Sequence, residues 1–273
     1  MNNTCCRCGL DQVLEDTLHP GGLKLTQRLA EVTLVKPGSK VLEIGCGKGI
    51  SSLFFARHYG CSVTGIDISP IQLASAREKA EDENLAERTT FIAADCQILP
   101  FCANSFDVAL SECSISLVSD KKRVLDEVRR VLKPGGIFTI TDLITRDGKV
   151  IKTSGKASPL SNGSFASFPC VDNAETIDGY KKLFQKAGFH NLFTEDCSLA
   201  LKETLFRMRL RFGRTDTLLK KIACTCDKYD SIVPVHEHRI PEKKGSIGYA
   251  LITATKEQIL HGEDNRRDTK PLP

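Results

Sequence analysis

The stretch that decides the fold is Val41-Leu-Glu-Ile-Gly-Cys-Gly-Lys-Gly49, a short apolar run followed at once by a glycine-rich turn. Residues 41–44 have the length and the branched apolar content of a buried strand, and residues 50–58 repeat apolar side chains at helical spacing. Gly45 and Gly47 allow a sharp turn of the backbone and the close approach of a ligand. The stretch therefore predicts a strand, a ligand-binding turn and a helix in succession.

The same alternation continues through residue 145. Strand-length apolar runs follow at 62–66, 90–94, 106–110 and 137–141, and helical spacing recurs near 70–83 and 120–132. Ser69-Pro70 provides a helix cap followed by proline at the first helical position, and Lys133-Pro-Gly-Gly136 ends the next helix. Alternating strands and helices indicate a parallel sheet with helices on both faces, a doubly wound α/β domain.

Beyond residue 145 the pattern is less regular. Residues 146–174 are rich in Gly, Ser, Pro and Asn, which is typical of an active-site cover or a disordered segment. Periodicity then predicts a helix near 175–187, a strand near 191–196, helical segments over about 199–229 and a last strand at 247–254. Within 199–214, two helical faces are expected: an apolar one and a basic one that is either solvated or substrate-facing, formed respectively by Leu201, Leu205, Met208 and Phe212, and by Arg207, Arg211 and Arg214.

Composition and charge limit the class of protein. Hydrophobic residues make up 41% and charged residues 26%, which are ordinary globular values. No apolar run approaches the roughly 20 residues that span a bilayer, and the first residues lack the apolar core of a signal peptide. We therefore expect a soluble, cytoplasmic protein without a membrane partner. A net charge of +4 is too small to indicate nucleic acid as a partner.

Cysteine is unusually frequent, with 12 residues in 273. Two groups invite a comparison with zinc sites, but neither has the usual C-x2-4-C spacing, so reduced or core cysteines are favoured and no metal site is predicted: Cys5, Cys6 and Cys8, and Cys224 with Cys226. Cys113 and Cys170 stand apart from both groups.

The glycine turn and the acids that follow it discriminate between ligands. The spacing here is G-x-G-x-G with Glu43 two residues upstream, whereas dinucleotide sites use G-x-G-x-x-G and present a helix N-terminus to pyrophosphate. A carboxylate at this place suits a cationic ligand. Asp67 and Asp95 end the second and third strands, where an acid can accept hydrogen bonds from ribose hydroxyls. Taken singly, each acid is equally a cap or turn residue.

Together, these motifs over residues 40–142 resemble the class I S-adenosylmethionine-dependent methyltransferases, of the small type 11-like kind. The resemblance implies a Rossmann-like sheet with an antiparallel last strand, and S-adenosylmethionine as cofactor. It also implies a cofactor-binding role for nine residues: Glu43, Gly45, Cys46 and Gly47 under the methionine part, Asp67 at the ribose, Ile68 beside the adenine, Asp95 and Cys96 at the adenine edge, and Ser111 at the fourth strand.

The segment His19-Pro-Gly-Gly-Leu-Lys-Leu-Thr26 precedes the first strand. In similar methyltransferases this region folds over the cofactor, so His19 and its glycines are lid candidates, with a simple turn and helix start as the alternative. The expected organisation is a lid segment at 1–39, a methyltransferase domain at 40–256 and a disordered tail at 257–273.

A local resemblance suggests an acceptor. Ser111-Glu-Cys-Ser-Ile-Ser-Leu117 is similar to a Ser-Asn-Cys-Val-Ile-Asn-Leu segment of arsenite methyltransferases, and Cys170-Val-Asp-Asn-Ala174 is similar to their Cys-Ile-x-Gly-Ala stretch. Cys113 and Cys170 thus correspond to two metalloid-binding thiols, although the third family thiol has no clear counterpart here. Thiolates are soft ligands that suit a soft metalloid. The alternative is that both are ordinary residues of a substrate pocket.

The sequence therefore predicts methyl transfer to a small molecule, with trivalent arsenic the most specific candidate. A dedicated base is optional, because the cofactor is already activated and the protein mainly aligns the acceptor. One alternative is a small-metabolite C-, O- or S-methyltransferase of the quinone-biosynthesis type. Another is a non-catalytic cysteine-rich metal-binding protein on the same fold.

Overall fold

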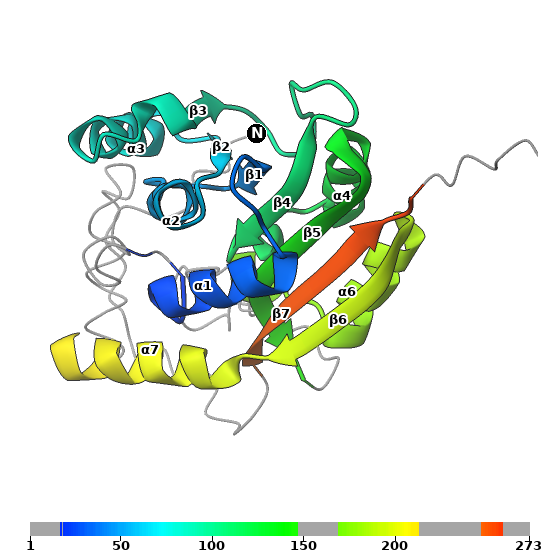
Figure 1. The fold of residues 1–273 in the computed structure, drawn as a ribbon. Helices are drawn as coiled ribbons and strands as arrows, with labels where there is room; N and C mark the ends of the chain where they lie inside the picture. Colours follow the sequence, from blue (N-terminus) through cyan, green and yellow to red (C-terminus); the bar gives the residue numbers. More distant parts are fainter. Residues whose placement is uncertain (1–16, 18, 147–168, 213–246, 259–273) are drawn as a thin grey trace, which may run out of the picture.

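A seven-stranded sheet runs through the computed structural model, which describes residues 17, 19–146, 169–212 and 247–258 (Figure 1). Its strand order is β3-β2-β1-β4-β5-β7-β6. Strands β1 to β5 pair in parallel, whereas β7 runs antiparallel to both β5 and β6. The predicted doubly wound sheet with an antiparallel last strand is confirmed. The strands are β1 Lys40–Ile44, β2 Ser62–Asp67, β3 Thr89–Ala93, β4 Phe106–Glu112, β5 Leu132–Thr145, β6 Phe189–Asp196 and β7 Ile247–Lys256.

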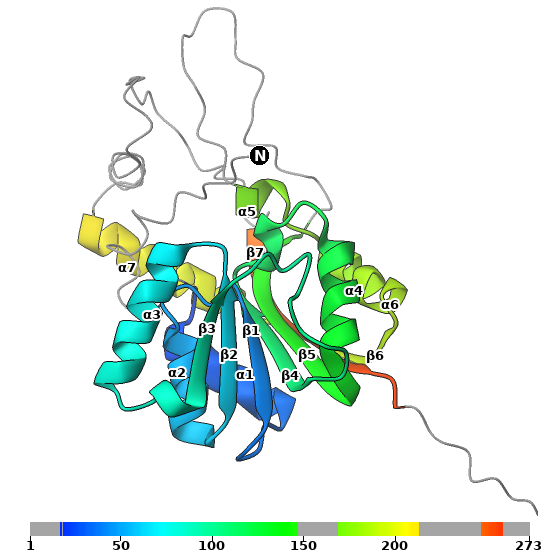
Figure 2. The same ribbon diagram turned by 90° about the horizontal axis from the view of Figure 1, so that it is seen from above.

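Helices cover both faces of the sheet, as Figure 2 shows. On one face, α1, α2 and α3 bury side chains such as Leu29, Phe55 and Leu73. On the other, α4 and α6 bury Val128 and Phe184. The helices are α1 Gly22–Thr33, α2 Ile50–Tyr59, α3 Pro70–Asp82, α4 Lys121–Val131, α5 Pro169–Asp172, α6 Ile177–Lys186 and α7 Ser198–Phe212, with 3-10 turns η1 Ala86–Arg88 and η2 Ile115–Leu117.

Strand β5 begins earlier than the sequence predicts. It starts at Leu132, directly after α4, and not at residue 137. Leu132 is fully buried and pairs with Phe106, while the next pair is Val108 with Ile137, so the register shifts between them. The predicted turn at 133–136 is therefore a bulge within the strand, and Gly135 adopts a φ of 76° there.

Two local predictions need correction. The sequence pattern places Cys170 in a long irregular segment, but this residue lies in the short helix α5. The predicted apolar face of α7 is only partly right: Leu201 is half-buried and Thr204 is buried, whereas Leu205 is 44% exposed. Polar Thr204 faces inward in this helix, which a pattern of apolar residues alone does not indicate.

Several predictions lie outside the described residues. They concern the cysteines at 5, 6, 8, 224 and 226, the side chains of Arg211, Phe212 and Arg214, the segments 147–168 and 213–229, and the tail from 259 onward. Among the helices that are described, none has the length and apolar character needed to cross a membrane.

Candidate functional site

The glycine turn after β1 folds back onto the end of β2. The amides of Gly45 and Cys46 both donate to the carbonyl of Ile66, at 2.8 and 3.0 Å. Gly45 and Gly47 have φ angles of 69° and 52°, which side chains other than glycine rarely adopt. The turn therefore presents backbone without a Cβ at the carboxyl edge of the sheet, as the sequence predicts.

Asp67 organises this turn from the end of β2. Its side chain is buried and accepts hydrogen bonds from the amides of Gly47 and Ser69, both at 3.0 Å. Ser69 in turn caps α3 by accepting from Gln72. One carboxylate thus holds the glycine turn and the start of α3 in a fixed relation. Its two oxygens accept up to about four hydrogen bonds, so the chemistry of the group is compatible with a ligand hydroxyl as donor.

An apolar shelf lies beside Asp67, after β2 and β3. Ile68 and Ile98 are 58% and 63% exposed, although both are large hydrophobic residues. Asp95 is exposed and accepts the amide of Gln97 at 2.8 Å. Burial and the nearby Asp95 raise the pKa of the Cys96 thiol to about 12, so this thiol stays protonated. Exposed apolar side chains next to carboxylates suit a flat ring that carries polar groups.

Glu43 is a buried acid on β1. Its carboxyl group accepts a hydrogen bond from the hydroxyl of Ser52 on α2. Burial, and then the charge of the neighbouring Glu112, raise the pKa of Glu43 to about 8. At neutral pH this carboxyl therefore carries a proton, which a cation arriving nearby would displace.

Glu112 is a site residue that the sequence reasoning missed. It ends β4 and is 7% exposed, with its carboxylate accepting from Thr26 at 3.1 Å and from Ser51. The available signal is its place at the carboxyl end of β4, between the predicted site residues Ser111 and Cys113. Ser111 itself donates to the carbonyl of Ile44 at 3.1 Å, so it ties β4 to β1.

The two candidate acceptor thiols come from elements that touch. Cys113 follows β4 with a φ of 55°, and its amide donates to the carbonyl of Thr141 at 2.7 Å. Helix α5, which carries Cys170, packs against η2. Both cysteines are half-buried, are not joined in disulfides, and pack against the same apolar cluster, which includes Leu143 and Ala174. The structure therefore brings together two elements that are 57 residues apart in the sequence.

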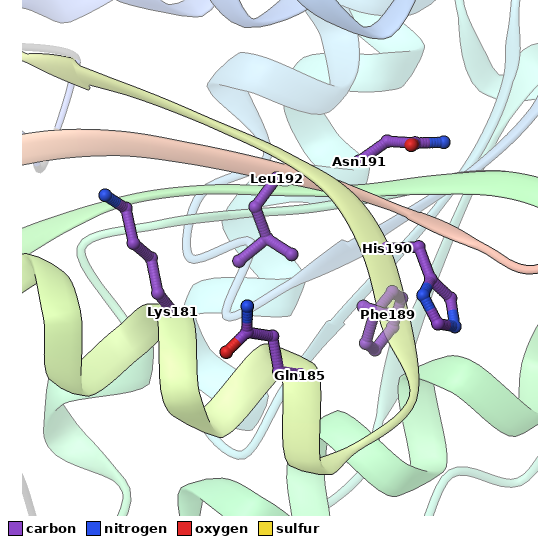
Figure 3. Close-up of a pocket in the computed structure, with 6 residues that line it drawn as sticks. All are labelled: Lys181, Gln185, Phe189, His190, Asn191 and Leu192. Atoms are coloured by element: carbon purple, nitrogen blue, oxygen red, sulfur yellow. The ribbon is translucent and has the colours of Figure 1, made fainter.

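A surface depression between α6 and β6 lies elsewhere. It is lined by Lys181, Gln185, Phe189, His190, Asn191 and Leu192 (Figure 3). Phe189 pairs with Lys256, and the adjacent Thr255 pairs with Ile137 near the amino end of β5. The depression is therefore near the opposite edge of the sheet from the glycine turn. It contains none of the predicted site residues.

Metal binding finds no support in the part of the chain that the structure describes. Within residues 17, 19–146, 169–212 and 247–258, no three His, Cys, Asp or Glu side chains converge in a way that could hold a metal ion. The cysteine groups considered for zinc lie outside these residues.

Known proteins share this arrangement. A family profile described as a methyltransferase domain matches residues 41–136. Methyltransferase GfsG of Streptomyces halstedii is 34% identical over 189 residues, and an uncharacterized protein of Haemophilus influenzae is 31% identical over 179. These alignments cover 69% and 65% of this chain, and 66% and 68% of the relatives. The chain belongs to the class I S-adenosylmethionine-dependent methyltransferases.

Two further similarities concern the acceptor and the cofactor. An arsenite methyltransferase of Halobacterium salinarum is 32% identical over 155 residues, which is 56% of this chain but only 38% of that relative. The solved structure of phosphoethanolamine N-methyltransferase 2 from Haemonchus contortus, in complex with S-adenosyl-L-methionine, has the same fold. Its TM-score is 0.69 at 21% identity, covering 92% of this chain and 56% of that one.

The methyltransferase is thus an enzyme that uses S-adenosylmethionine and acts on a small molecule. The residues at the carboxyl edge fit this cofactor. The glycine turn offers backbone without a Cβ, Glu43 offers a carboxyl for a cationic amine, and Ile68 and Ile98 offer an exposed apolar shelf.

Proposed function

We propose that residues 40–256 form the methyltransferase domain and bind S-adenosylmethionine along the carboxyl ends of β1 to β4, while residues 1–39 cover the cofactor. Nine residues would hold it, in the order in which their strands lie along the sheet edge. They are Glu43, Gly45, Cys46 and Gly47 at the methionine part, Asp67 at the ribose, Ile68, Asp95 and Cys96 at the adenine, and Ser111 at the end of β4.

The supporting argument is one of charge. The cofactor supplies a methyl group activated by attachment to a sulfonium. Its ammonium group would lie near Glu43, whose raised pKa means that a nearby positive charge favours loss of the carboxyl proton. Ser52 orients that carboxyl and Ser111 holds the adjoining strand in register.

We further propose a thiol-bound metalloid, with arsenite as the specific candidate, as the acceptor. The observation that carries this is the pairing of Cys113 and Cys170, half-buried thiols on elements that pack together at the carboxyl edge. The similarity to an arsenite methyltransferase supports the same assignment. Soft sulfur ligands prefer a soft centre, and binding requires deprotonated thiols.

The step is an in-line displacement. Trivalent arsenic held by thiolates keeps a lone pair, and this lone pair forms the As–C bond while the methyl–sulfur bond breaks. Arsenic is formally oxidised to the pentavalent state, and the electron pair of the broken bond stays on the sulfur of S-adenosylhomocysteine. No base is required, so Cys113 and Cys170 act by holding the acceptor in line.

The test is methyl transfer from labelled cofactor to arsenite, to small thiols and to quinol precursors. Cys113→Ser and Cys170→Ser replace soft sulfur by hard oxygen, so each variant should lose arsenite methylation and keep its affinity for the cofactor. Cys102→Ser is the matched control, because Cys102 is an exposed free thiol that precedes β4 at the opposite edge of the sheet. No arsenite-dependent turnover by the wild-type enzyme, or full activity in both serine variants, contradicts the metalloid assignment.

A second acceptor class is favoured by the curated relatives. GfsG aligns over 69% of this chain, whereas the arsenite methyltransferase aligns over 56%. Turnover of a quinol precursor or thiol in the same assay, without arsenite, would indicate a small-metabolite C-, O- or S-methyltransferase. The family assignment replaces the alternative of a non-catalytic metal-binding protein.

A further inference from the structure

Glu112 is contacted by three segments of the chain that otherwise lie apart. His19, from the residues before α1, places its Nε2 3.5 Å from the Oε1 of Glu112. Thr26 of α1 donates to the same carboxylate, and so does Ser51 of α2. All four side chains are buried, with exposed fractions between 0 and 7%. A carboxylate at the end of β4 therefore gathers the amino-terminal segment and two helices.

The chemistry of the His19 ring fits an electrostatic contact. Nδ1 lies 3.3 Å from the carbonyl oxygen of Pro20, while Nε2 faces the carboxylate of Glu112. Because an oxygen faces each ring nitrogen, a proton on both nitrogens makes both contacts favourable. An imidazolium opposite a carboxylate meets this condition. In the described part of the chain, Nε2 has no hydrogen-bond partner at ordinary distance, so charge rather than a short hydrogen bond links the pair.

This contact lies directly behind the glycine turn. Ser51 and Ser52 are neighbours in the first turn of α2, and they bind Glu112 and Glu43 respectively. Gly49, the last glycine of the turn, is the residue that begins this helix. Glu112 also raises the pKa of Glu43 through its charge. The group that holds the amino-terminal segment therefore borders the proposed methionine end of the cofactor site.

We propose that Glu112 is a positioning residue that holds residues 19–33 over the methionine end of the cofactor and so slows the release of the cofactor. It acts through His19 and Thr26. The inference rests on the proposed cofactor site and assigns to Glu112 a function that the methyl-transfer chemistry does not itself require.

A second ion pair on α1 provides the matched control. Arg28 donates to Glu195 of β6 at 2.9 and 3.0 Å, which ties the same helix to the edge strand of the sheet. Both side chains are more than a third exposed. Glu195→Gln therefore loosens α1 by the same substitution as Glu112→Gln, but away from the glycine turn.

The experiment follows tritiated S-adenosylmethionine as it dissociates after dilution into excess unlabelled cofactor, together with amide hydrogen exchange of residues 19–33. Glu112→Gln should raise the dissociation rate by about tenfold or more, as expected for the loss of hydrogen bonds to a charged group. His19→Ala should also raise the rate. It leaves the Thr26 and Ser51 contacts with Glu112 in place, so it tests the inference even where Glu112→Gln fails to fold. Exchange in residues 19–26 should rise in both variants, and Glu195→Gln should leave the dissociation rate unchanged.

The outcomes separate the two proposals. Unchanged dissociation in both the Glu112 and His19 variants, or an equal increase in the Glu195 variant, overturns the positioning role while leaving the cofactor site intact. Failure of the wild-type protein to bind S-adenosylmethionine overturns the cofactor site itself.

Discussion

Replacing Glu43 by glutamine should stabilise the fold in a way that depends on pH. Glu43 is buried under the glycine turn and has a pKa of about 8, compared with 4.5 for an ordinary glutamate. Glutamine has nearly the same shape and its amide oxygen can still accept the hydrogen bond from Ser52, but it has no proton to lose. The substitution therefore removes the titration and keeps the packing.

The sign follows from proton linkage. Between pH 4.5 and pH 8 the unfolded chain ionises at this position, whereas the folded chain still holds the proton. The wild-type protein therefore loses stability as the pH rises through this range, and the Glu43→Gln variant does not. At about 1.36 kcal/mol for each pH unit above 4.5, the advantage of the variant is about 3 kcal/mol at pH 7 and is absent near pH 4.5.

The assay is urea unfolding of both proteins at pH 5, 6, 7 and 8. The difference in free energy of unfolding should grow steadily with pH. Glu31→Gln is the control, because Glu31 is about half exposed and pairs with Arg28 at the surface. A difference between the wild type and the Glu43→Gln variant that stays constant across these pH values would refute the proposed proton on Glu43.

Further predictions concern the cofactor and the buried hydroxyl groups. Binding of S-adenosylmethionine should release a proton from Glu43, so calorimetry in two buffers of different ionisation enthalpy should detect a release that is smaller in the Glu43→Gln variant; equal release in both proteins would assign it to the cofactor's own amino group, which has a pKa of about 8. Asp67→Ala should weaken cofactor binding by about 1.5–3 kcal/mol in the same titration, and unchanged affinity would contradict the ribose assignment. Tyr180→Phe should be neutral or stabilising in thermal unfolding, because the buried Tyr180 hydroxyl has no hydrogen-bond partner among the described residues. Tyr249→Phe should cost about 1 kcal/mol or more, since the Tyr249 hydroxyl bonds to Thr141; similar costs for both tyrosines would count against this contrast.

Much of the fold could be predicted because local patterns determine it. The spacing of apolar residues indicates the alternating strands and helices, and parallel pairing then brings the carboxyl ends of the strands to one edge. Glu43, Asp67 and Asp95 each end or follow a strand, so their convergence at the carboxyl edge follows from topology alone. The glycine turn likewise needs only local backbone geometry.

Features that depend on distant contacts could not be predicted. The part played by Glu112 depends on Thr26, which is 86 residues away, and on His19, and no periodicity encodes these contacts. The proton on Glu43 depends on burial beside Glu112. The early start of β5 depends on the pairing of Leu132 with Phe106 across the sheet.

The most direct test of the central claim is a calorimetric titration of this protein with S-adenosylmethionine and, separately, with NAD. A site built from a G-x-G-x-G turn with Glu43 beneath it should bind the sulfonium cofactor and give no response to the dinucleotide. Tight binding of NAD without any response to S-adenosylmethionine would contradict the assignment of the carboxyl edge as a methyl-donor site.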